Sequence, residues 1–157
     1  LADIANDESR AYRSVLSPEN AAEFHKAIGL AAHGVGIGSF VYLRRIFERL
    51  IQSRFAEFKE TEKWNEDDFK KLRMAEKIDF LKGHLPEFLV ENARIYSILS
   101  SGIHELDEKT CLGFFGVIRS SIILILEEDK EKQKKLRLQD ELMKAIAGFT
   151  PPPLGAE

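Results

Sequence analysis

The chain has 157 residues, of which 44% are hydrophobic and 31% charged, and its formal net charge is −3. These fractions are typical of a globular protein and exclude a wholly disordered one. The negative balance excludes a basic field over the whole molecule of the kind that attracts nucleic acid. Because the chain has one cysteine and no internal disulfide can form, the composition favours a reducing, cytoplasmic setting.

The first half of the chain carries three helical patterns. A loose apolar face over Ile4–Leu16 predicts the first helix. Ser17 is a good N-cap residue and Pro18 suits the first helical position, so the pair predicts a second helix start. Apolar residues three and four apart then predict a long helix over Phe40–Lys59.

Three alternating glycines, Gly34, Gly36 and Gly38, precede that long helix. A dinucleotide-binding fingerprint would need a glycine where Ser39 stands, and a strand before the glycines where the pattern is helical. Each glycine would cost a helix on the order of 1 kcal/mol. We therefore expect a tight helix-to-helix junction or close helix packing here. A weaker hypothesis is that a helix starting at Ser39 holds an anion at its N-terminus.

The next predicted helix begins with the acidic residues after Asn65, because acids are favoured at a helix N-terminus, and is closed by Gly83. Another begins at Pro86 and is expected to end at Ser100–Gly102, and the last is capped by Asp107 or Thr110. Its pattern becomes charged after residue 126, returns to apolar positions at near-helical spacing, and is stopped by three consecutive prolines.

These patterns predict an all-α fold, because no segment alternates with the period of a strand. Short connections favour antiparallel neighbours and hence an up-and-down bundle of about five to six helices. We assign residues 1–149 to one helical domain and residues 150–157 to a proline-rich disordered tail. The apolar run Ser121–Leu126 is far shorter than the roughly 20 residues of a membrane span, so no membrane partner is expected.

Two places carry candidate functional residues. Arg44, Arg45 and Glu48 lie on the long helix, and His104 lies in the predicted turn before the last helix. A histidine beside an acid in a turn can transfer protons, but a turn histidine often hydrogen-bonds the backbone instead, and Arg–Glu pairs commonly decorate helix surfaces. The four histidines show no metal-binding spacing, so neither a metal nor a cofactor is predicted.

A local basic run follows the last apolar segment. The simplest interpretation is a solvated helix face, in which acids and lysines four residues apart form pairs. The alternative is a surface for nucleic acid or for another partner. Its cations are Lys130, Lys132, Lys134, Lys135 and Arg137.

The segments Tyr42–Leu50 and Leu99–Leu106 resemble two motifs of the HEPN-like and DUF4145-type bacterial domains: a helix of the form LRRALE-L, and a turn with a glycine followed by a histidine. Many HEPN proteins are dimeric ribonucleases of toxin, abortive-infection or CRISPR systems. These proteins carry an arginine followed, after four to six residues, by a histidine, and the pair acts across the dimer interface. His104 matches that histidine. The positions for the arginine hold Ser97, Ile98 and Leu99, so the motif is not intact.

We therefore expect a non-catalytic interaction or dimerisation module of a bacterial protein, related to phage defence or stress. Arg44, Arg45, Glu48 and His104 would form one polar cluster that locks the bundle or faces a partner. A homodimer, a protein partner or RNA are the expected partners. The alternatives are a metal-independent ribonuclease using His104, and a nucleic-acid-binding module using Lys130–Arg137.

Overall fold

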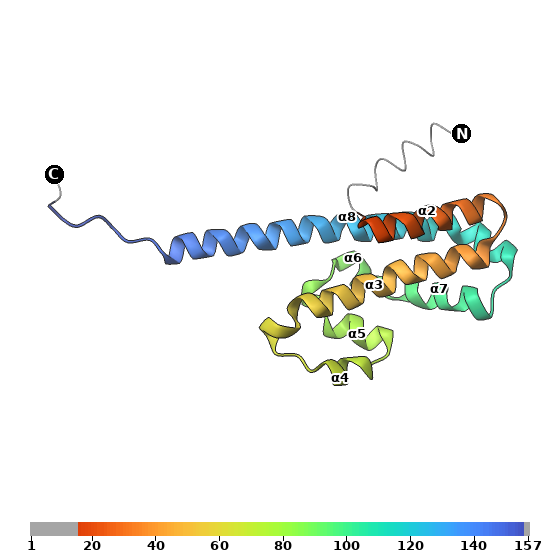
Figure 1. The fold of residues 1–157 in the computed structure, drawn as a ribbon, viewed down its shortest axis with the longest axis horizontal. Coiled ribbons are helices and arrows are strands. Elements are labelled where there is room, and N and C mark those ends of the chain that lie inside the picture. The colour runs from red at the N-terminus through yellow and green to blue at the C-terminus, as the bar shows by residue number, and fades with distance from the viewer. Residues whose placement is uncertain (1–15, 156–157) are drawn as a thin grey trace, which may run out of the picture.

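The computed structural model describes residues 16–155, and every regular element within this range is a helix (Figure 1). The described range has seven α-helices and one 3-10 helix. The predicted helix over Ile4–Leu16 lies almost wholly outside the described residues. The elements are α2 (Pro18–Ala32), α3 (Gly36–Glu62), α4 (Glu66–Lys70), α5 (Met74–Phe80), η1 (Lys82–His84), α6 (Glu87–Glu91), α7 (Arg94–His104) and α8 (Glu108–Ala147).

The junction between α2 and α3 follows the local signals in the sequence. The Ser17 hydroxyl accepts a hydrogen bond from the Asn20 amide at 3.2 Å, which confirms it as the N-cap of α2. At the other end of α2, Gly34 takes a φ of 81°, a conformation that glycine adopts without strain. This glycine turns the chain so that α3 begins at Gly36, earlier than the expected start near Phe40.

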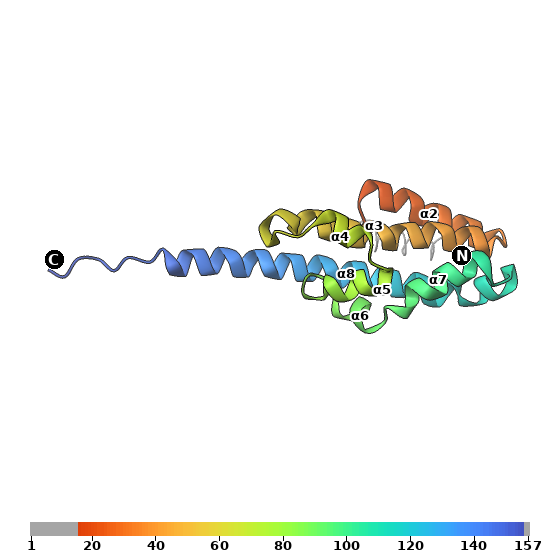
Figure 2. The same cartoon turned by 90° about the horizontal axis from the view of Figure 1, so that it is seen from below.

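Helix α3 is the centre of the fold, and α2, α7 and α8 pack against it (Figure 2). Two glycines allow the closest approaches. A methyl group at Gly36 would lie 2.8 Å from the Glu108 carbonyl oxygen on α8, and one at Gly102 on α7 would overlap the buried ring of Phe40. The expectation of close packing at the glycine segment is confirmed at Gly36. The largest fully buried side chains include Phe24, Phe40, Phe55, Phe69, Leu43, Ile46, Ile51, Leu85, Leu89 and Leu99.

Two helices predicted as continuous are each divided. The one expected between Asn65 and Gly83 breaks into α4, α5 and η1, and a new helix starts after Arg73, whose amide donates to the Glu76 carboxylate at 3.1 Å. In a single straight helix Phe69 and Ile78 would point to opposite sides. Since both are only 2% exposed, the break allows both to reach the core.

The prediction of one continuous helix from Pro86 to Ser100–Gly102 is also wrong, both in its continuity and in where the helix ends. It breaks at Asn92, whose side-chain amide donates to the Phe88 carbonyl at 3.0 Å, and so separates α6 from α7. Helix α7 then continues through the serines and Gly102 as far as His104. His104 therefore lies in the last turn of a helix and not in a connecting turn.

Helix α8 is 40 residues long and only its first part is covered by the body of the protein. The Asp107 carboxylate accepts from the Thr110 amide at 2.7 Å, which confirms the predicted cap. Every residue from Arg137 to Gly155 is exposed, and this end of α8 projects away from the other helices (Figures 1 and 2). We call residues 137–149 the arm.

Helix α8 bears on the expectation that no membrane partner is present, because the apolar run Ser121–Leu126 is part of a longer apolar stretch. The helix contains an 18-residue window with a mean hydropathy of 1.7, which is long and apolar enough to cross a membrane by length and composition. A third of that window is buried inside the protein, and core helices of water-soluble proteins pass the same test, so the finding is weak evidence for a membrane.

Candidate functional site

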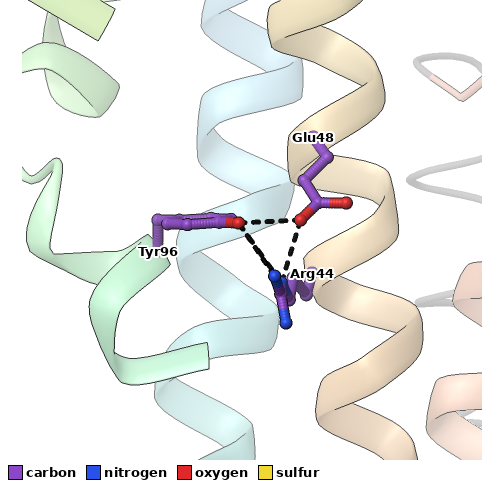
Figure 3. Close-up of polar contacts among 3 residues, drawn as sticks. All are labelled: Arg44, Glu48 and Tyr96. Atoms are coloured by element: carbon purple, nitrogen blue, oxygen red, sulfur yellow. Dashed lines mark hydrogen bonds and ion pairs between the residues drawn. The ribbon is translucent and has the colours of Figure 1, made fainter. Parts of the chain in front are cut away.

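The best-defined polar cluster joins α3 to α7 through Arg44, Glu48 and Tyr96 (Figure 3). Arg44 and Glu48 are one helical turn apart, with 2.9 Å between Nε and Oε1. The Tyr96 hydroxyl donates to the same Oε1 at 2.7 Å and accepts from Arg44 Nη2 at 3.1 Å. Three side chains thus close a triangle of hydrogen bonds, and the tyrosine brings in the second helix.

The electrostatics of this triangle favour a neutral tyrosine beside a fixed ion pair. Burial, followed by the hydrogen bond to Glu48, raises the pKa of Tyr96. Burial acts to lower the pKa of Arg44, but the hydrogen bonds and charges of Tyr96 and Glu48 outweigh it, so the pKa is raised. Because the charge of Arg44 is balanced and its Nε and Nη2 both donate within the cluster, the cluster suits the fastening of α7 to α3 better than proton transfer.

Arg45 belongs to a different cluster on the side of α3 that faces α2. Its Nη2 lies 2.8 Å from Oε1 of Glu23, a carboxylate that is only 7% exposed as a residue. Arg49 is bonded to the second oxygen of Glu23, and also to Glu19 at 2.8 Å. Two arginines on α3 therefore neutralise one buried carboxylate on α2.

His104 joins neither cluster. It is exposed at the C-terminal end of α7, about two helical turns or about 12 Å of rise beyond Tyr96. No hydrogen bond or ion pair links it to Arg44, Arg45 or Glu48 among the described residues. The expected four-residue cluster is thus divided three ways: Arg44 and Glu48 meet, Arg45 contacts α2, and His104 lies apart.

Another ion pair, which is more buried than those above, joins α3 to α8. Arg54 Nη2 lies 2.6 Å from Oδ2 of Asp129, and the two side chains are 6% and 14% exposed. Arg54 also contacts the half-exposed Glu57 at 3.1 Å. Burial raises the pKa of Asp129 although Arg54 acts to lower it. No motif in the sequence indicated this pair.

The N-terminus of α3 holds an anion, but the helix begins at Gly36 and not at Ser39 as the weaker hypothesis assumed, and the anion is the chain's own. The amides of Gly36 and Ile37 both donate to Oε2 of Glu108, the latter at 2.9 Å. The carboxylate balances the positive end of the helix dipole. Since Glu108 occupies this position, a phosphate would have to displace it.

The basic run lies along α8 where the helix leaves the body. Lys132 donates to the Leu85 carbonyl at 2.7 Å, so this lysine fastens α8 to the segment before α6. Lys134, Lys135 and Arg137 are exposed. Lys132 and Lys135 also line a surface pocket of about 460 Å³ together with three glutamates and other residues. The cations therefore do not form a purely basic surface.

In residues 16–155 no group of three or more histidine, cysteine, aspartate or glutamate side chains could hold a metal ion. Cys111 is buried, and burial raises the pKa of its thiol. No known protein family matches the chain. No curated protein and no solved structure matches it either.

Proposed function

We propose that the chain is a non-catalytic helical module of HEPN/DUF4145 type that serves interaction or dimerisation. The observation that carries this proposal is the exposed apolar arm of α8. Leu138 and Leu142 are each 53% exposed and Ile146 is 74% exposed, on a helix with nothing packed beside it among the described residues. Contiguous apolar surface of this kind marks interaction sites, because leaving it in water is unfavourable.

The placement of the polar residues supports the non-catalytic part of the proposal. A ribonuclease site needs its acid–base group and its cation within reach of one phosphate. Arg44 is held by Glu48 and Tyr96, and Arg45 by Glu23, whereas His104 stands apart at the end of α7. A catalytic role for His104 would need another cation beside it.

Two assays on the full chain test the proposal. Analytical ultracentrifugation of the wild type and of the triple variant Leu142→Asp, Met143→Asp, Ile146→Asp measures association. We expect association to be lost in the variant, while circular dichroism shows an unchanged helix content because the three residues are exposed. In parallel, a generic RNA is incubated with the wild type, with His104→Ala and with the control His25→Ala, which changes another exposed histidine.

We expect no RNA cleavage by any of the three proteins. Cleavage that disappears in His104→Ala but persists in His25→Ala would replace the proposal with the ribonuclease alternative. Unchanged association of the triple variant would show that the arm is not the interaction surface.

A further inference from the structure

An exposed stripe of residues runs the whole outward side of α8, away from the buried Ile118, Ile122 and Ile125. It begins at Gly113, is centred on Glu131 and ends at Phe149, just past the helix. Counted outward from Glu131 in either direction, successive positions of the stripe are four, three, four, three and four residues apart. The stripe therefore consists of residues 113, 117, 120, 124, 127, 131, 135, 138, 142, 145 and 149. Every position is exposed, and this spacing keeps all of them on one helix face. We call it the outer stripe.

Two glycines at the start of the outer stripe have no structural reason within the described chain. A methyl group added at Gly113 or at the neighbouring Gly116 would meet nothing within 4 Å. Each glycine costs the helix roughly 1 kcal/mol relative to alanine. A glycine inside a helix commonly permits close approach by another element. An element that approaches the outer stripe from outside would account for both.

We infer that this element is α8 of a second copy, which pairs with the first in antiparallel orientation along the outer stripe, with a two-fold axis beside Glu131. The inference rests on the proposed dimerisation function and names its partner and surface. A two-fold interface must be complementary to itself, so the side chains at equal distances on the two sides of Glu131 must fit one another. The arm of each copy then lies along the part of α8 that belongs to the other copy's body.

The side chains fit this pairing in size. Leu138 of each copy lies opposite Leu124 of the other, and both leucines are exposed in the single chain. Leu142 lies opposite Ser120, and Phe149 opposite Gly113 of the second copy, so large side chains meet small ones. Such alternation allows facing helices to interdigitate without a cavity.

The charges on the outer stripe fit as well, with one exception. Lys135 lies level with Glu127 of the second copy, so opposite charges meet there. Charged residues in the middle of the stripe disfavour a lipid surface as its occupant. The exception is Glu131, which meets Glu131 of the second copy at the axis, and this repulsion makes a distinctive prediction.

Sedimentation of the full chain over a range of concentrations tests the surface. Leu138→Asp places a carboxylate in the stripe, and we expect the dimer dissociation constant to rise at least about tenfold, since about 1.4 kcal/mol of lost contact suffices. Met143→Asp is the matched control: Met143 is an exposed apolar residue of the same arm, 69% exposed, but lies off the stripe. Its effect should stay within about threefold. Glu131→Gln should strengthen the dimer several-fold because it removes the repulsion.

Cysteine cross-linking tests the register, and the native Cys111 does not interfere because it is buried. Under mild oxidation Glu131→Cys should link two copies, because the residue faces itself across the axis. Leu138→Cys alone should not, because the two cysteines would be about 21 Å apart along the helices. The double variant Leu124→Cys, Leu138→Cys should link again.

A dimer that Leu138→Asp leaves intact, or a Leu138→Cys protein that links readily to itself, would overturn this pairing while leaving the proposed dimerisation function standing. Two results would overturn the pairing and the dimerisation part of the proposed function together. One is a wild type that stays monomeric at every concentration. The other is cross-linking of the outer stripe to residues 1–15 of the same chain. The ribonuclease assay would then decide the non-catalytic part separately.

Discussion

Replacement of Asp129 by alanine would leave the guanidinium of Arg54 buried with one remaining partner. Removing one member of a buried ion pair costs about 3–5 kcal/mol, because the other charge stays out of water without compensation. Arg54 is 6% exposed, but it keeps the 3.1 Å contact with the half-exposed Glu57. We therefore expect a loss near the lower end, about 3 kcal/mol in the free energy of unfolding. For a chain of this size this corresponds to a fall of about 6–12 °C in Tm.

Urea unfolding followed by the fluorescence of Trp64 measures the loss. Trp64 is the single tryptophan, and its ring lies 5.6 Å from the ring of Phe55, the residue that follows Arg54 on α3. The emission of Trp64 therefore reports on this part of the core. The double variant Arg54→Met, Asp129→Leu removes both charges and keeps much of the side-chain volume. We expect it to lie within about 1 kcal/mol of the wild type, because apolar replacements of a buried pair are often neutral.

The pH dependence offers an independent check of the same pair. Burial raises the pKa of Asp129 in the folded protein above the ordinary aspartate value. The folded protein therefore binds the proton more tightly than the unfolded chain, and the contribution of this group falls as pH rises from below the ordinary pKa through the raised one. The stability difference between the wild type and Asp129→Asn should shrink in that direction. A loss below about 1 kcal/mol in Asp129→Ala, typical of an exposed pair, would refute the reasoning.

Three further predictions concern the helix contacts and the basic run. Gly102→Ala should destabilise the protein by about 1–3 kcal/mol because its methyl group would overlap Phe40. The methyl group of the control Gly29→Ala meets nothing within 4 Å, so this variant should be stabilised by about 0.5–1 kcal/mol. Thermal unfolding compares the two variants, and equal effects would contradict the packing at Gly102. Tyr96→Phe should lower the free energy of unfolding by about 0.5–1.5 kcal/mol because it removes the hydrogen bond to Glu48. Glu48→Gln should lower it less in the Tyr96→Phe background than in the wild type. Independent losses in this double-mutant cycle would mean that the hydrogen bond does not couple α3 to α7. We expect no binding of nucleic acid by the basic run of the wild type. Binding whose affinity falls steeply with salt and that the double variant Lys134→Glu, Lys135→Glu abolishes would favour the nucleic-acid alternative.

The sequence by itself determined where most helices begin and that the glycines before α3 form a junction between two helices. Ser17, followed by Pro18, caps α2 as predicted, and Asp107 caps α8. These caps are predictable because a cap depends on atoms within three residues of each other. The glycine junction and the all-helical class were predictable for the same reason: backbone conformation and apolar periodicity are local properties.

Only the tertiary structure decided which side chains meet. Arg44 and Glu48 could be paired from their spacing, but Tyr96, Glu23 and Asp129 come from other helices, and no local signal links them to their arginines. The breaks that divide two predicted helices arise because residues such as Phe69 and Ile78 must both reach the core, a demand set by packing and not by helix propensity. Exposure likewise follows from the fold: only the packed body shows that α8 continues beyond it and leaves its apolar arm without a neighbour, because burial depends on what the rest of the chain places beside a helix.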